Sequence, residues 1–163
     1  MISLSENFLI HCDIAEQFET QLNHTEVIAA ATAVLYAEGL ENQSIELSVA
    51  ISDDEEVRQL NNSYRNVDNT TDVLSFAAEE SQENSIFALP PDAQATRYLG
   101  DIIISYPQAE RQAPEFGNSV TREVQELVIH GVFHLLGYDH EKDADREVMR
   151  AKEEIASKTL DGK

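Results

Sequence analysis

Three histidines in the C-terminal part of the chain are the residues best suited to carry chemistry. His130 and His134 lie in the apolar stretch 127–136, and residues four apart on a helix share one face, with Cβ atoms about 5–6 Å apart. That separation suits one Zn²⁺ ion bound at about 2.0–2.1 Å from each imidazole nitrogen. Gly137 can adopt the left-handed conformation that ends a helix, so the chain can turn and return His140 as a third ligand. The sequence therefore predicts one zinc ion per chain, held by His130, His134 and His140.

Other interpretations of these residues stay open. Two core histidines bonded to the backbone, with His140 at the surface, would need no metal. The H-x3-H-x5-H spacing is also that of metzincin proteases, but those enzymes place a glutamate general base directly after the first histidine, where this chain has Gly131. A zincin-type peptide or amide hydrolase is therefore a weaker alternative. Cys12 as a fourth ligand would close the site, but it lies at the other end of the chain.

Arg65 is the second candidate for a role in catalysis. It is one of only five basic residues before Lys142, all of them arginines. A guanidinium can contact a phosphate through two hydrogen bonds and neutralise charge that develops on it. The alternative is a surface arginine paired with Asp68 or Asp72. Asp72, like Asp101, could also accept a hydrogen bond from a ligand imidazole, but capping at the edge of the core is the favoured role for both carboxylates.

The elements that must position these residues follow from hydrophobic periodicity and from helix stop signals. Strands are predicted over 7–14, 44–51, 72–76 and 99–105, and helices over 25–38, from a Ser52 cap onward, from Ser119 or Thr121 to Leu136, and over 143–157. A long loop is expected over 79–96, with further breaks at Pro107, 114–117 and Gly137. The order of elements predicts an α+β fold, in which helices pack on a mixed sheet of about four strands and a central buried helix carries the metal site.

Length and charge limit the classes of function. The 163 residues suit a single domain, 1–163, with its own core, and the net charge is −20. Residues 1–57 contain no Lys or Arg, so neither a secretory signal nor a basic stripe for nucleic acid or anionic membrane is expected there. No apolar run approaches the ~18 residues of a membrane span. Cys12 is the only cysteine, which suits a reducing compartment such as the cytoplasm.

Three segments together resemble a known family. HGVFHLLGYDH (130–140) is similar to the signature of the bacterial YbeY endoribonucleases, also called ribosomal RNA maturation factors. LNNSYRNVDNTTDVLSF (60–76) and LGDIIIS (99–105) match the family's other two characteristic segments in order and spacing, so the resemblance covers roughly residues 45–155. Thr70 stands where a proline is common, and Ala77 where a proline usually follows Ser-Phe. Neither departure removes a chemical group.

The resemblance implies a zincin-like fold, the three histidines as zinc ligands, and Arg65 as the catalytic residue near the metal. The implied activity is zinc-dependent cleavage of single-stranded RNA in ribosomal RNA processing and ribosome quality control, in the cytoplasm. Expected partners are ribosomal RNA and the ribosome or a ribosome-associated protein, but neither DNA nor a membrane. No general base is apparent, so metal hydroxide or the substrate's 2′-hydroxyl is the expected nucleophile. A non-catalytic ribosome assembly factor is the other class, and the charge of −20 favours it somewhat.

Overall fold

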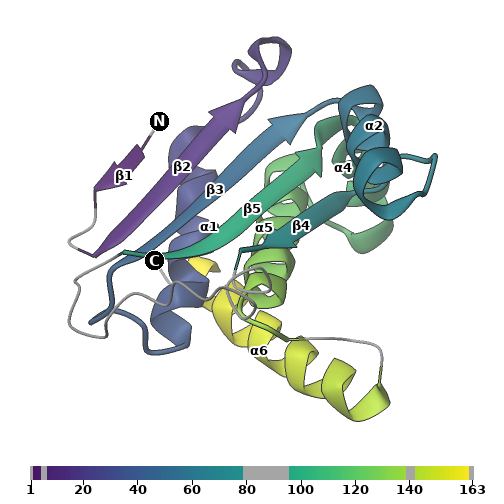
Figure 1. Ribbon diagram of the computed structural model, residues 1–163. Coiled ribbons are helices and arrows are strands. Elements are labelled where there is room, and N and C mark those ends of the chain that lie inside the picture. The colour runs from purple at the N-terminus through teal and green to yellow at the C-terminus, as the bar shows by residue number, and fades with distance from the viewer. Residues whose placement is uncertain (1, 5–6, 79–95, 139–141, 162–163) are drawn as a thin grey trace, which may run out of the picture.

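The computed structural model describes residues 2–4, 7–78, 96–138 and 142–161 (Figure 1). Its elements in chain order are β1 (Ile2–Leu4), β2 (Phe8–Ile14), η1 (Glu16–Phe18), α1 (His24–Ala37), β3 (Ile45–Ser52), α2 (Asp54–Arg65), β4 (Val73–Ala77), β5 (Arg97–Ser105), α4 (Tyr106–Gln112), η2 (Ala113–Phe116), α5 (Val120–Leu135) and α6 (Asp143–Asp161). None of the helices in these ranges is long and apolar enough to cross a bilayer.

The strands form one mixed sheet in the order β1-β2-β3-β5-β4. The central strands β2, β3 and β5 run parallel, and β1 and β4 pair antiparallel at the two edges. The predicted α+β class with a mixed sheet is therefore confirmed. The expectation of about four strands missed β1, because a three-residue edge strand is too short to show a period-two pattern.

The core lies between one face of this sheet and helices α1 and α5, with α6 lying across both helices (Figure 1). Alternate residues of each central strand face these helices, as Ile10, Leu47 and Ile102 do, and all three are fully buried. Helix α5 contributes Ile129, Val132 and Phe133 to the same core. The opposite face of the sheet is more polar, and there His11 Nε2 lies 2.6 Å from a carboxylate oxygen of Glu46.

Two predicted boundaries are wrong for local reasons. Ser52 does not cap α2, because it is the last residue of β3 and its hydroxyl donates instead to Glu56. The cap is Asp53, whose carboxylate accepts a hydrogen bond from the Glu56 amide at 2.9 Å. Pro107 does not break the chain either, since it lies in the first turn of α4, where a missing amide hydrogen costs no helical bond.

The other predicted helices are confirmed with small changes in length. Ser119 caps α5, and its hydroxyl accepts a hydrogen bond from the Arg122 amide at 3.1 Å. Helix α6 continues past the predicted end at Ser157 to Asp161, because Leu160 extends the apolar stripe of Met149 and Ala156 against the core. The loop predicted over 79–96 lies outside the described residues except for its last position.

Candidate metal centre

The two histidines of α5 converge on one point. Their Nε2 atoms are 3.0 Å apart, and the two rings meet edge to face with centroids 4.5 Å apart. Two nitrogens bound to a tetrahedral zinc ion at about 2.1 Å each would lie about 3.4 Å apart. The pair is therefore close to the geometry that a metal ion needs, and a small opening of the two side chains would admit one.

Glu153 on α6 fixes the orientation of the first histidine. Its Oε1 lies 3.2 Å from Nδ1 of His130, and the His130 side chain is 31% exposed. A carboxylate only accepts hydrogen bonds, so Nδ1 carries the proton and Nε2 presents its lone pair toward His134. This is the tautomer that a metal ligand requires, and carboxylates commonly impose it on ligating imidazoles.

Glu153 was not predicted from the sequence. Asp72 and Asp101 were the carboxylates expected as possible acceptors of a hydrogen bond from a ligand imidazole. The Asp72 carboxylate instead accepts from the Val73 amide at 2.8 Å and from the Gln112 side chain at 3.2 Å, as a cap at the start of β4 does. Asp101 accepts from the Tyr98 hydroxyl and points away from the helices. A signal for Glu153 existed: it follows buried Met149 by four residues and therefore shares the inner face of α6.

The chain turns after α5 as Gly137 predicts. Gly137 has φ +100°, and the Tyr138 amide donates to the carbonyl of Phe133 at 3.1 Å. The Tyr138 hydroxyl donates to Glu38 at 2.5 Å, and Lys152 lies 3.0 Å from the same carboxylate. Hydrogen bonds to α1 thus hold the residue at which the described part of this turn ends.

His140 lies outside the described residues, so its predicted role as third ligand stays a prediction. Within the part of the chain that the structure describes, no group of three or more His, Cys, Asp or Glu side chains is placed to hold a metal ion. The described half of the candidate centre is the pair His130 and His134. The predicted third donor, His140, belongs to the segment that follows Tyr138 in the sequence.

Arg65 lies beside His134. It ends α2, and its Nη2 donates to the backbone carbonyl of Ser75 on β4 at 3.1 Å. The guanidinium carbon is 6.0 Å from the ring centroid of Phe76. A pocket of about 420 Å³ is lined by Tyr64, Arg65, Ser75, Phe76, Ala77, His134 and Leu135.

The alternative role for Arg65, as a partner of Asp68 or Asp72, differs from what the structure shows. Asp68 pairs with Arg58 at 2.5 Å, and Asp72 is occupied as described above. No carboxylate in the described ranges lies within 4.0 Å of the Arg65 guanidinium. Within the described ranges its charge is therefore not neutralised by a carboxylate, and the residue lines the pocket that it shares with His134.

A second pocket opens on the other side of the histidine pair. It has a volume of about 350 Å³ and is lined by Asp72, Val73, Gln112, Phe116, Asn118, Glu123, Glu126, Leu127, His130 and Glu153. Glu123 is buried there and accepts hydrogen bonds from Gln112 at 2.6 Å and from Asn118 at 3.0 Å. Its carboxylate therefore joins the end of α4 and the loop before α5 to α5.

The geometry also bears on the three other interpretations of the histidines: a peptide hydrolase, two core histidines bonded to the backbone, and a site closed by Cys12. A Cβ at Gly131 would lie 3.0 Å from Cδ1 of Ile102, so this position faces the sheet and carries no general base. Both histidines have side-chain partners rather than only backbone ones. Cys12 is buried on β2, and burial raises the pKa of its thiol to about 11.

Comparison with known proteins places the chain in one family. The model of the family described as Endoribonuclease YbeY matches residues 12–161. The Endoribonuclease YbeY of Desulforamulus reducens is 43% identical over 143 residues, which cover 87% of this chain and 90% of that protein. That of Roseiflexus castenholzii is 44% identical over 147 residues, or 90% and 89% of the two chains. These relatives are a class of enzymes that cut RNA internally.

The chain therefore belongs to the Endoribonuclease YbeY family. A solved structure supports the fold independently. The solution structure of TM1509 from Thermotoga maritima matches with a TM-score of 0.59 at 27% identity and covers 94% of this chain and 89% of that one.

Proposed function

We propose that the chain is a zinc-dependent endoribonuclease that cleaves single-stranded RNA during ribosomal RNA processing and ribosome quality control. Membership of an endoribonuclease family makes it a hydrolase that acts on RNA. One observation carries the rest of the proposal: His134, whose Nε2 lies 3.0 Å from that of His130, shares a pocket with the Arg65 guanidinium. A metal ligand and a phosphate-binding cation beside one another are what hydrolysis of a phosphodiester needs.

The zinc ligands would be His130, His134 and His140, as in a zincin-like centre with an open coordination position. A zinc ion bound there would lower the pKa of a bound water to about 7 and polarise the scissile phosphate. Glu153 holds the His130 ring in the tautomer that binds metal. Arg65 holds the phosphate and neutralises charge on its oxygens, because its guanidinium is fixed to the Ser75 carbonyl on the rim of the pocket.

The charge of the chain bears on how it meets RNA. At −20, the chain repels phosphates over most of its surface, so a ribosome-associated partner in the cytoplasm would have to bring the substrate close. The same charge favours the second candidate, an assembly factor that binds ribosomal RNA or protein without cutting it.

Cleavage of a labelled single-stranded RNA by purified protein supplied with zinc tests the proposal, with zinc occupancy matched between the wild type and the arginine variants. We expect cleavage by the wild type and none by His134→Ala. Arg58→Ala is the matched control for Arg65→Ala, since Arg58 lies on the same helix but pairs with Glu55 and Asp68 away from the pocket. A zinc-loaded wild type that binds RNA without cutting it would overturn the nuclease proposal in favour of the assembly factor.

A further inference from the structure

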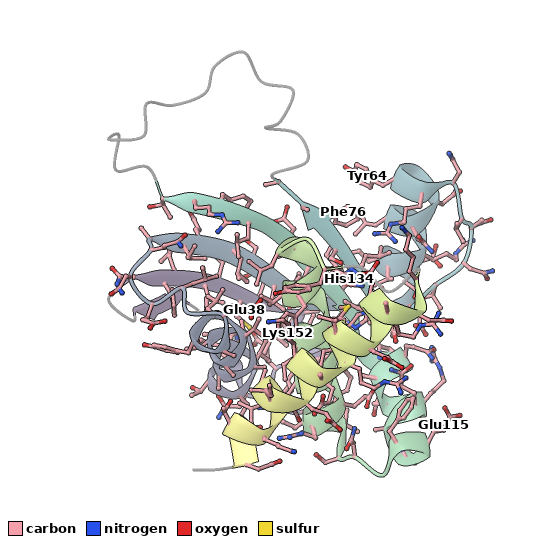
Figure 2. The ribbon with its side chains drawn as sticks, turned by 90° about the horizontal axis from the view of Figure 1, so that it is seen from below. Glu38, Tyr64, Phe76, Glu115, His134 and Lys152 are labelled. Carbon is pink, nitrogen blue, oxygen red and sulfur yellow. The ribbon has the colours of Figure 1, made fainter. Side chains whose placement is uncertain are left out.

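Two aromatic rings, the exposed ring of Tyr64 and the half-buried ring of Phe76, line the Arg65 pocket. The Tyr64 side chain is 69% exposed, and its ring meets that of Phe76 edge to face, with centroids 5.3 Å apart. Both residues line the pocket that also contains His134. Figure 2 shows Tyr64 and Phe76 beside each other, with His134 on the neighbouring helix α5. Neither ring is needed to fill the core, because Tyr64 projects from the last turn of α2 into solvent.

Backbone contacts hold the two rings in place. Phe76 lies on β4 opposite Asp101 of β5, and the next pair is Ala77 and Gly100. A Cβ at residue 100 would lie 2.1 Å from the Phe76 carbonyl oxygen, so only glycine allows the two strands to approach this closely. The Arg65 guanidinium ties the end of α2 to Ser75, the neighbour of Phe76. The elements that carry the two rings are therefore joined to each other by contacts that involve no ligand.

The chemistry of the surroundings selects the kind of ligand. Attraction to phosphates cannot supply much affinity in a chain of charge −20, so RNA must be held by another type of contact. Stacking of a base on an aromatic ring contributes affinity without charge and accepts every base, because each has a π-face. The Arg65 guanidinium carbon lies 6.0 Å from the centroid of the Phe76 ring, so the pocket offers an aromatic contact for a base and a cation for a phosphate side by side.

We propose that Tyr64 and Phe76 form a platform on which an unpaired base of the RNA substrate stacks, next to the phosphate held by Arg65. This inference rests on the proposed function, because it assigns the part of the pocket that recognises single-stranded rather than paired RNA. Bases in a duplex are already stacked on one another and cannot cover the Tyr64 ring. The platform accounts for a preference for single strands that no basic surface provides.

Binding of short single-stranded oligoribonucleotides that carry 2-aminopurine at one position each tests the platform. The wild type, with its metal removed by a chelator so that nothing is cut, should quench the fluorescence of the probe at one position through stacking. Tyr64→Ala should lose this quenching and bind roughly 5- to 150-fold more weakly, the equivalent of about 1–3 kcal/mol per stacked base. Tyr64→Phe and Tyr64→Trp should retain both the quenching and the wild-type affinity.

Tyr36→Ala is the matched control. Tyr36 is 54% exposed and meets Phe8 edge to face at 5.2 Å, but it lies on α1 and lines no part of the Arg65 pocket. Wild-type binding and quenching by Tyr64→Ala, or quenching by none of the probes with the wild type, would overturn the platform. Tyr64-dependent binding by a protein that never cuts RNA would instead keep the platform and overturn the proposed nuclease activity.

Discussion

The carboxylate of Glu153 on α6 lies 3.2 Å from Nδ1 of His130 on α5. This contact joins two helices that the chain connects through the segment containing His140. It orients one candidate metal ligand and also fastens α6 to the helix that carries it. The orientation of the His130 ring and the packing of α6 are therefore linked through this hydrogen bond.

Glu153→Gln should weaken zinc binding by about 10- to 100-fold, because the amide no longer favours the ligating tautomer of His130. Competition with a chromophoric chelator measures the affinity directly and does not depend on activity. Glu154→Gln is the matched control, since Glu154 is the adjacent glutamate and is exposed on the outer face of α6. Equal zinc affinity in the two variants would exclude Glu153 from the metal centre.

Arg65→Ala should lower the rate of RNA cleavage by about 10²–10³-fold, because a charge-assisted contact to the transition state is lost. Zinc affinity should stay at the wild-type value, since Arg65 does not ligate. Arg65→Lys should restore only part of the rate, because an ammonium lacks the planar fork of a guanidinium. Wild-type rates in both variants would remove Arg65 from catalysis and favour the assembly-factor alternative.

Removal of metal should lower the thermal stability without unfolding the chain. The core between the sheet and helices α1 and α5 is built from apolar side chains that pack without a metal, and a ligand specific to the folded state adds stability by mass action. Melting curves with and without chelator, followed by circular dichroism, measure the difference. A chain that is already unfolded after chelation would show that the zinc is structural.

The stability should depend on pH through Asp54, at the start of α2. Hydrogen bonds from Arg111 lower the pKa of its carboxyl most, and bonds from Ser105 and Thr70 lower it further. A pKa lowered in the folded state means that the charged form stabilises the fold above the unfolded value of about 3.9, and that this contribution is lost as the pH falls through the folded value.

Asp54→Asn should therefore destabilise the chain at pH 7, by about 1 kcal/mol or less because the ion pair is partly exposed. Denaturant unfolding at a series of pH values tests this, and the difference between wild type and variant should shrink as the solution is made more acidic. Asp53→Asn is a useful comparison, since asparagine also caps helices well. A difference that grows toward acid pH would contradict the assigned direction.

The sequence predicted the elements that show a strong period and missed the contacts that only tertiary packing creates. The alternation of Phe8, Ile10 and Cys12 located β2, and Gly137 located the end of α5. The spacing of His130 and His134 predicted the convergence of two imidazoles, since a helix fixes that relationship locally.

Local sequence patterns do not indicate contacts between distant parts of the chain. Glu153 meets His130 only because α6 folds back along α5, and Tyr64 meets Phe76 only because α2 ends beside β4. The short strand β1 was missed because three residues are too few to show a period-two pattern, and the capping role of Asp53 was missed because Ser52 is also a good capping residue. Residue type alone does not separate such candidates.

A crystal structure of the zinc-loaded protein, with anomalous scattering recorded at the zinc edge, tests the central claim most directly. We expect one zinc ion about 2.0–2.1 Å from a ring nitrogen of each of His130, His134 and His140. Its fourth coordination position should be open to water and face the Arg65 pocket. An ion bound elsewhere, a His140 ring that points away from the other two, or a fourth protein ligand that closes the site would contradict it.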